Sequence, residues 1–433
     1  MRGNRGVGAD ATPLRLAVVG GGWAGIAAAV RATEAGHRVT LFEMAPRLGG
    51  RARGVDIDGL ALDNGQHILI GAYRRTLALM RTVGSDPAAT LARLPLELRY
   101  PDGRGLRFPP GSPWLGFARA VATARGWGWP DRLALLGVAS GWALRGFRCA
   151  PSLTVDQLCA RLPRSVREIL IDPLCVAALN TSAHQASAAV MLRVLRDALF
   201  GGPGASDLLL PRCSLDGLLP SPATAWLRAQ AAEVLLGHRV QRLERAGEDW
   251  LLDGERFDAA VLACTAAEAA RLVTSIDRDW AARAEALPYE PIVTVYLRAP
   301  GARLPAPMTA LVAGPEAPAQ FAFDHGALGG PADVFAFVIS GARPWVERGL
   351  ETTGQAVVAQ ARGTLGDAKR EPELLRVLAE KRATFRCLPE LARPRMEIRP
   401  RLLAAGDHVE GPYPATLEGA VSAGEQAVAM LRR

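Results

Sequence analysis

The chain has 433 residues, of which 49% are hydrophobic and 22% charged, a composition typical of a globular protein with room for two domains. Its net charge of +8 favours an anionic partner such as a membrane surface, whereas no basic run interleaved with aromatic residues indicates nucleic-acid binding. No charge-free apolar stretch is long enough to span a membrane. The six cysteines form no CxxC pair and no Cys/His cluster, so we expect free thiols, a reducing compartment and no metal site.

The first predicted elements form a βαβ unit. A polar, glycine-rich segment over 1–13, expected to be disordered, precedes an apolar strand over 14–19. An alanine-rich helix over 24–35 and a second strand over 39–42 follow. Parallel strands joined in this way build a doubly wound α/β sheet.

The turn between the first strand and the helix fits the G-x-G-x-x-G pattern of dinucleotide-binding loops. The first glycine permits the tight turn, the second lets the backbone approach a pyrophosphate, and the third lets the helix pack on the sheet. Glu43, at the end of the second strand, is placed to accept hydrogen bonds from a ribose and disfavours NADP. The alternative is a glycine-rich turn with no ligand. The predicted cofactor contacts here are Gly20, Gly22, Trp23, Ala24, Gly25 and Glu43.

The remaining pattern predicts two interleaved domains. A Rossmann-type α/β domain is built from 14–75, 214–270 and 395–433, and a mixed α+β substrate domain from 76–213 and 271–394. Within these segments we expect helices over 133–144, 186–199, 222–232 and 417–431. We expect strands over 233–236, 239–244, 250–252, 257–263, 292–297, 334–339 and 402–405.

The segment Leu48-Gly49-Gly50-Arg51 resembles the Gly-Gly-Arg turn of the flavin amine oxidase and carotenoid desaturase superfamily. This resemblance implies FAD as the cofactor, with Gly49, Gly50 and Arg51 near its pyrophosphate and flavin. It also places Gly406, Asp407 and Leu417 near the ribityl chain and flavin ring, and Val240, on a short strand, near the adenine. The alternatives are a solvated arginine, an ordinary Gly-Asp turn and a core valine.

A closer resemblance lies in Leu62-Asp63-Asn64-Gly65-Gln66-His67-Ile68-Leu69, with Tyr73 after it, in the run from Asp172 to Thr181, and in Leu209-Leu210-Pro211 followed by Leu215. Over about residues 14–431 the chain looks like the squalene-associated desaturase family, the hydroxysqualene dehydroxylases of bacterial hopanoid synthesis. Membership implies that reduced FAD passes a hydride from N5 to an allylic cation of hydroxysqualene, releasing water and squalene.

His67 is the candidate proton donor, because histidine titrates near neutrality; the alternative is a structural histidine. Tyr413 is a second pocket candidate, and its alternative is a turn aromatic. The chain has no lysine before Lys369, whereas amine oxidases of the superfamily commonly use one near the flavin. The segment 406–419 contains no cysteine, so we expect FAD to be bound non-covalently.

The segment 111–150 combines four tryptophans and five arginines with one acid, Asp131. This pattern fits a surface that docks on a membrane interface, and equally an amphipathic helical domain packed on its own core. The resemblance implies a cytoplasmic protein at the inner membrane, with squalene-synthase-like enzymes upstream. The electron donor is not evident from the sequence.

Three other functions stay open. A phytoene-type carotenoid desaturase would share the fold and cofactor but form a double bond. A flavin amine oxidase would release peroxide from polyamines. A non-enzymatic flavin-binding scaffold of a squalene-synthesising complex would bind FAD and turn over no isoprenoid.

Overall fold

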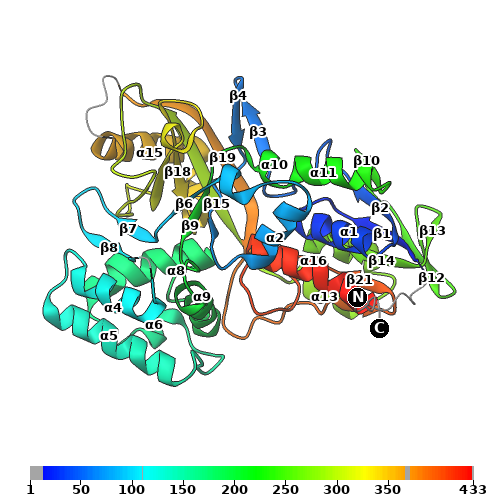
Figure 1. The fold of residues 1–433 in the computed structure, drawn as a ribbon, viewed down its shortest axis with the longest axis horizontal. Coiled ribbons are helices and arrows are strands. Elements are labelled where there is room, and N and C mark those ends of the chain that lie inside the picture. The colour runs from blue at the N-terminus through cyan, green and yellow to red at the C-terminus, as the bar shows by residue number, and fades with distance from the viewer. Residues whose placement is uncertain (1–12, 110, 366–370, 432–433) are drawn as a thin grey trace, which may run out of the picture.

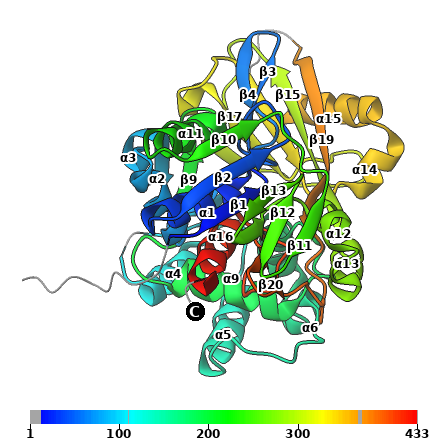
Figure 2. The same cartoon turned by 90° about the vertical axis from the view of Figure 1, so that its right-hand side faces the viewer.

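The computed structural model describes residues 13–109, 111–365 and 371–431. Nearly all of the predicted disordered tail, residues 1–12, lies outside them. Figure 1 shows the first and last parts of the chain, blue and red, together on one side, and the helices α4 to α9 on the other. Figure 2, turned by 90°, looks onto the side that holds β1, β2 and α16.

The main sheet has the strand order β10-β2-β1-β14-β21-β20 and is parallel except for the last pair. Helices cover one face and further helices with a small antiparallel sheet cover the other, so the inner strands are buried on both sides. The strands are β1 (Arg15–Val19), β2 (Arg38–Glu43), β10 (Glu233–Leu236), β14 (Ala259–Leu262), β20 (Glu397–Arg399) and β21 (Leu402–Ala404). The covering elements are α1 (Trp23–Glu34), α11 (Pro220–Ala229) and α16 (Leu417–Leu431) on one face, and α12 (Ala266–Val273), α13 (Arg278–Glu285), β11 (Leu243–Ala246), β12 (Asp249–Leu252) and β13 (Glu255–Phe257) on the other.

The contact between α1 and α16 explains the alanine-rich sequence of both helices. A Cβ atom at Gly424 of α16 would lie 2.2 Å from the backbone oxygen of Ala24. Only glycine therefore fits at this crossing, and the small side chains of α1 let the two backbones approach.

A second, antiparallel sheet has the order β16-β17-β18-β15-β19. Successive side chains of its strands point to opposite faces of the sheet, so each strand contributes to two cores. One face packs against the two helices that follow β18 in the chain, and the other packs against the helices within residues 113–200. The elements are β15 (Tyr289–Arg298), β16 (Met308–Ala310), β17 (Phe321–Asp324), β18 (Val334–Ile339), β19 (Glu373–Phe385), α14 (Arg343–Arg348) and α15 (Leu350–Thr364).

The helical part of this domain contains the predicted helices over 133–144 and 186–199, which the structure shows with shifted ends. Its elements are α4 (Pro113–Thr123), α5 (Trp129–Leu144), α6 (Val155–Leu158), α7 (Arg164–Val166), a π-helical turn (Arg167–Ile171), α8 (Asp172–Leu179) and α9 (Ala188–Phe200). Short elements complete the described chain: α2 (Arg74–Thr82), α3 (Pro87–Thr90), α10 (Leu215–Leu218), a 3-10 turn (Gly326–Leu328), β3 (Gly54–Ile57), β4 (Leu60–Asp63), β5 (Leu69–Ile70), β6 (Leu91–Leu94), β7 (Glu97–Arg99), β8 (Gly105–Arg107) and β9 (Leu208–Pro211).

The strand predicted over 239–244 is wrong over 239–242, where Val240 lies in a loop, and β11 begins only at Leu243. Its backbone oxygen accepts a hydrogen bond from Arg271 at 2.6 Å. The N–H groups of Gln241 and Arg242 donate to the carboxylate of Asp253. Side chains thus take the backbone groups that a strand partner would need.

Candidate active site

A cavity of about 1210 Å³ runs between the main sheet and the second domain. One end is formed by the glycine loop after β1, and its wall continues past Glu43, the turn around Arg51 and the loop carrying His67. The start of α16 closes it, while α8, α9 and the second sheet form the far end. Every predicted cofactor and catalytic residue except Gly25 lines this cavity.

The three glycines that define the G-x-G-x-x-G pattern have three different surroundings. Gly20 has a φ of +105°, and a Cβ there would lie 2.7 Å from Ala263 O. A Cβ at Gly25 would lie 1.8 Å from Gly20 O, so this glycine allows α1 to pack on the sheet. A Cβ at Gly22 would meet nothing nearer than Gly50 Cα at 3.9 Å. Gly22 therefore leaves open a space that a phosphate group fits, beside the first N–H groups of α1.

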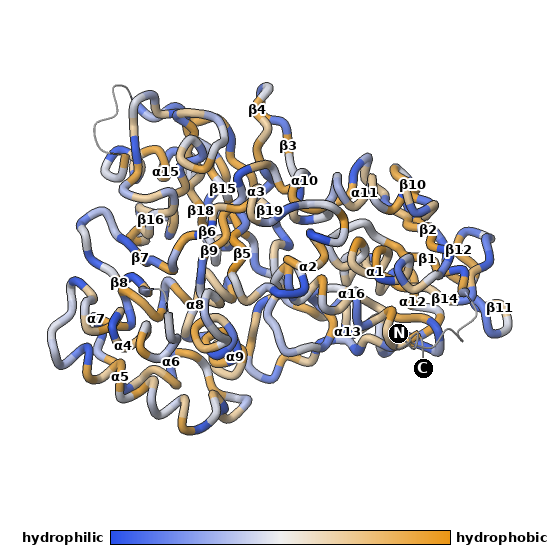
Figure 3. Tube along the Cα trace, in the orientation of Figure 1, coloured by the Kyte–Doolittle hydropathy of each residue, from blue (hydrophilic) through white to orange (hydrophobic). Residues whose placement is uncertain are grey.

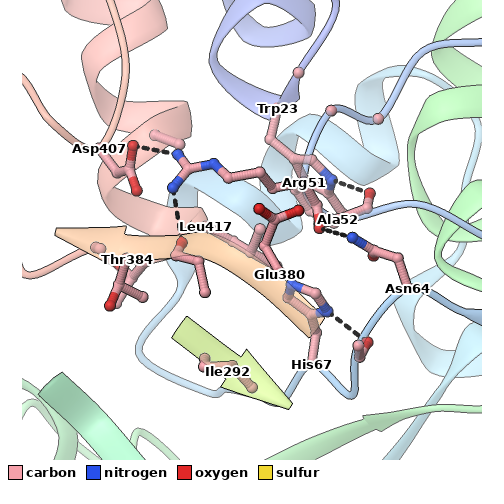
Figure 4. A pocket seen from close by; sticks show the side chains of 18 of the residues that line it. Trp23, Arg51, Ala52, Asn64, His67, Ile292, Glu380, Thr384, Asp407 and Leu417 are labelled. Atoms are coloured by element: carbon pink, nitrogen blue, oxygen red, sulfur yellow. Dashed lines mark hydrogen bonds and ion pairs between the residues drawn. The ribbon is translucent and has the colours of Figure 1, made fainter. Parts of the chain in front are cut away.

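The Gly49-Gly50-Arg51 turn lies directly against this loop. The N–H of Gly49 donates to Gly21 O at 2.8 Å, and Gly50, with a φ of +60°, would place a Cβ only 3.0 Å from Gly22 Cα. The indole of Trp23 donates to Ala52 O at 3.1 Å, which ties the turn to the first turn of α1 (Figure 4). The two glycine motifs therefore build one cradle.

Glu43 is buried, and its carboxylate stabilises the cradle by accepting two backbone hydrogen bonds. Its Oε2 accepts the N–H of Gly21 at 2.6 Å and its Oε1 accepts the N–H of Ala45 at 2.7 Å. A carboxylate has about four acceptor positions, so two stay available for the hydroxyls of a ribose. The adenosine side of the cavity continues to Val240.

Arg51 and Asp407, which the sequence pattern assigned separately to the cofactor, form an ion pair of 2.5 Å (Figure 4). The other arm of the guanidinium donates to Ala383 O of β19 at 2.8 Å. Burial alone would raise the pKa of Asp407, but Arg51 and His408 outweigh it and hold that pKa below its usual range. The pair links the glycine turn, β19 and the strand end after β21, and its remaining N–H groups line the cavity.

The C-terminal segment supplies a helix start at the cavity wall. A Cβ at Gly406 would lie 2.6 Å from His408 Nδ1, so the backbone turns here only with glycine. Leu417 begins α16, and the first backbone acceptor before it, Thr416 O, takes the N–H of Ala420. Of the N–H groups in the first turn, that of Gly419 donates to Thr416 Oγ1 at 3.1 Å, and the start of the helix presents a partial positive charge to the cavity. From the glycine loop to the start of α16, the residues present fit a dinucleotide cofactor.

His67 lies in the cavity wall with its Nδ1 2.8 Å from Gly65 O. Because a carbonyl only accepts, the proton of the neutral ring is on Nδ1 and Nε2 carries a lone pair. Desolvation by the surrounding protein lowers the pKa of His67, and the charge of Arg51 lowers it further against the effect of the Gly65 bond. His67 is therefore neutral at pH 7 and must receive a proton before it can donate one.

The second domain contributes residues that the sequence pattern did not indicate. Glu380 and Thr384 of β19 and Ile292 of β15 line the cavity, and Figure 4 shows them projecting into the same space as His67. Three consecutive charged residues inside a strand, Glu380 to Arg382, are a sequence pattern from which this part of the site could have been predicted. Lys381 is exposed and does not line the cavity.

The far end of the cavity is apolar. Its side chains come from α8, α9, β5, β7 and the second sheet, and they are Ile68, Ile70, Leu96, Leu98, Leu174, Val194, Leu195, Leu199, Met308, Phe321, Phe323 and Val338. Among the described residues that line the cavity there is no lysine. Tyr413 also lines it, with the guanidinium of Arg193 5.1 Å from the centre of its ring. Ligand pockets commonly enclose roughly 300–1,000 Å³, so this one has room for a long apolar molecule beside a cofactor.

The model of the flavin containing amine oxidoreductase family matches residues 23–431. The chain therefore belongs to this family and is an FAD-dependent oxidoreductase, which confirms the predicted α/β flavoprotein fold and its cofactor. An oxidoreductase from Methanosarcina mazei has the same fold, with a TM-score of 0.73 and 16% identity over 96% of this chain and 100% of that one.

Relatives of this chain include two hydroxysqualene dehydroxylases. The one from Rhodopseudomonas palustris is 28% identical over 95% of this chain and 96% of that protein. The one from Sinorhizobium fredii is 25% identical over 96% and 97%. A probable zeta-carotene desaturase from Synechococcus elongatus is 35% identical, over 28% of this chain and 26% of that protein. The predicted resemblance to the hydroxysqualene dehydroxylases is thus confirmed over nearly the whole chain.

Proposed function

We propose that the protein converts hydroxysqualene to squalene, with non-covalently bound FAD as its cofactor. One observation carries the proposal: the nucleotide cradle opens into a long, apolar cavity lined, as far as the structure describes it, by no lysine. Burying a thirty-carbon hydrocarbon against such walls makes the free energy of binding more favourable by about 25 cal/mol for each Å² of apolar surface buried. The similarity to hydroxysqualene dehydroxylases along both chains supports the same substrate.

Reduced FAD, when bound, supplies the hydride for the allylic carbon. The protein's own residues hold the cofactor through the glycine cradle, Arg51, Asp407 and the start of α16. They exclude water from the apolar end and place the hydroxyl of the substrate near His67. Its Nε2 is the atom from which that hydroxyl receives a proton before it leaves as water.

The test is a single turnover without oxygen. The flavin is photoreduced, hydroxysqualene is added, and the flavin spectrum is followed while the lipid is extracted. Reoxidation of the flavin with one equivalent of squalene is the expected result. A flavin that stays reduced would contradict the proposal. Phytoene with oxidised enzyme is the second arm, because of the partial similarity to a zeta-carotene desaturase; a new double bond there would establish a desaturase instead.

We further propose that the protein takes its substrate from an anionic membrane through α4 and α5. Five of the ten large apolar side chains exposed among the described residues lie on these two helices: Trp114, Leu115, Trp129, Leu133 and Leu144. Figure 3 shows these helices, together with α9, as largely apolar. Trp114 stacks on Phe200 of α9 with ring centres 4.0 Å apart, and other residues of α9 line the cavity. Among the described residues no helix is long and apolar enough to cross a membrane.

Vesicle binding tests this docking surface. Replacing Leu144, which is 90% exposed, and Trp129, 66% exposed, by glutamine should weaken binding to phosphatidylglycerol vesicles by about tenfold or more, because each side chain buries apolar area worth about 1.5–3 kcal/mol. Val312→Gln is the control, since Val312 is 62% exposed outside these helices. Equal binding of the two variants would contradict the docking surface.

A further inference from the structure

A second cavity, of about 370 Å³, shares one wall with the active cavity. That wall is Gln66, which lines both spaces. The other walls come from the hairpin end at Gly59–Asp63, the segment from Pro211 to Ser214 after β9, and the turn that carries His325. The residue after Gln66 is His67, which lines the active cavity but not the second one, so Gln66 stands between the second cavity and the proposed proton donor.

Polar atoms without partners face this region. Gln66 Oε1 and His325 Nε2 are buried and find no hydrogen bond within the described part of the chain. Thr294 Oγ1, 3.7 Å from where a Cβ of Gly65 would lie, is in the same state. Buried polar groups in native proteins are satisfied by protein or by ordered water. Water in a cavity of this size would satisfy Gln66 Oε1 and His325 Nε2, which belong to residues in its wall.

Asp63 is the acid in the wall of the second cavity and is 4% exposed. Its Oδ1 accepts the N–H of Leu215 at 2.8 Å. Burial raises the pKa of Asp63 to about 7, with a contribution from Asp216 and against the effect of the Leu215 bond. Its carboxyl group therefore stays protonated at a higher pH than that of an exposed aspartate, which suits a group that passes protons.

The other titratable groups around Asp63 are not placed to act as the proton donor instead of it. Asp216 is held by Arg47 at 3.1 Å and by the N–H of Gly54 at 2.7 Å. Tyr296 donates its hydroxyl to the backbone oxygen of Asp63 and not to the carboxylate. Burial lowers the pKa of His325 to about 4, against the charge of the neighbouring Asp324, so its ring is neutral. Cys213 and Arg212 are exposed at the rim of the cavity.

We propose that water in the second cavity carries the proton consumed by the reaction, from Asp63 past Gln66 to His67. The inference rests on the proposed function. In each turnover the C–O bond of the substrate breaks and a C–H bond forms with the hydride of reduced FAD. The proton passes from Asp63 through water to His67 Nε2 and then to the departing oxygen, which leaves as water. Asp63 regains a proton from solvent at the rim near Cys213. Gln66 orders the connecting water and loses no proton of its own.

Asp63→Asn is the decisive variant and Asp324→Asn is its matched control. Both aspartates are almost fully buried, at 4% and 3% exposed, and each accepts one backbone N–H that an amide oxygen can also accept. Only Asp63 lines the second cavity. The single-turnover rate of squalene formation is measured between pH 5.5 and 9. The wild-type rate should fall as the pH rises through about 7. Asp63→Asn should be about ten- to a hundredfold slower and lack this step, whereas Asp324→Asn stays within about twofold.

A second measurement needs neither substrate nor turnover. Infrared spectra of the oxidised holoenzyme should show a carboxyl C=O band that disappears as the pH rises through about 7 in the wild type and in Asp324→Asn, and is absent in Asp63→Asn. Gln66→Leu should retain this titration but show the same slow turnover. Flavin content and the unfolding midpoint separate these effects from misfolding.

Three results would overturn the relay. Asp63→Asn with the wild-type rate and pH profile would refute it while leaving the dehydroxylase in place. Loss of the pH step in Glu380→Gln, with Asp63→Asn unaffected, would place the proton source in the active cavity. Wild-type enzyme that yields no squalene would refute the proposed function, and the relay with it, whatever the infrared titration shows.

Discussion

The two glycines Gly22 and Gly25 lie three residues apart, yet the structure predicts opposite consequences for alanine at each. At Gly22 the backbone has φ −71° and ψ 180°, which alanine adopts, and the nearest atom to a new Cβ is 3.9 Å away. The apoprotein should lose no more than about 1 kcal/mol, since alanine is a poorer N-cap than glycine by about this amount. The new methyl group would, however, occupy the space beside the first N–H groups of α1.

FAD binding measures that effect. A pyrophosphate that loses one charge-assisted hydrogen bond binds about 1.5–3 kcal/mol more weakly, which is about ten- to 150-fold in the dissociation constant. Titration of apoprotein with FAD, followed by quenching of flavin fluorescence, should show this loss for Gly22→Ala.

Gly25→Ala should instead unfold the domain. Its Cβ would lie 1.8 Å from Gly20 O, so α1 must move away from the sheet, at more than the usual overpacking cost of about 1–3 kcal/mol. Denaturant unfolding of the apoproteins compares the two variants. Normal FAD affinity in Gly22→Ala, or normal stability in Gly25→Ala, would refute this view of the cradle.

Three further predictions concern single residues. Asp407→Asn should lower the free energy of unfolding of the apoprotein at pH 7 by about 1–3 kcal/mol, because a largely buried carboxylate loses its ion pair with the partly exposed Arg51. Since the folded pKa of Asp407 is depressed, the wild-type advantage should be present above pH 4 and disappear as the pH falls below it; a difference that persists in acid would contradict the ion pair as its cause. His67→Gln should leave the flavin bound and slow the single turnover by about 10²–10⁴-fold, and normal turnover would exclude the acid role. Asn180→Ala should cost about 3 kcal/mol or more in denaturant unfolding, because this residue ends α8 in a left-handed conformation and its buried side chain makes hydrogen bonds to three other segments; unchanged stability would show that these bonds contribute little.

The part of the nucleotide cradle built by the glycine loop was predictable because its pieces are contiguous. The strand, the glycine loop and α1 follow one another within twenty residues, and each glycine has a local steric reason. The Arg51–Asp407 pair was not predictable in the same way, since its members are 356 residues apart and only the tertiary fold brings them together. Val240 was placed on a strand because its neighbours are strand-forming, but the side chains of Arg271 and Asp253 compete for the backbone.

The apolar end of the cavity was predictable only through resemblance. Its walls come from seven separate stretches of the chain between Ile68 and Val338, and no local periodicity distinguishes a residue that lines a cavity from one that fills a core. Glu380 illustrates this limit: a strand pattern gives the alternation of its neighbours, but not which face of β19 meets His67.

The crossing of α1 and α16 at Gly424 also bears on the order in which the protein is made. During synthesis β1, α1 and β2 leave the ribosome first, but the helix that covers α1 and the strand β21 beside β14 follow only after residue 400 has been added. Until then, the face of α1 that α16 will cover and the edge of the sheet at β14 are exposed to water. Parallel pairing between strands that are far apart in the sequence forms slowly. The described cofactor site is therefore complete only once α16 has been synthesised and has packed on α1.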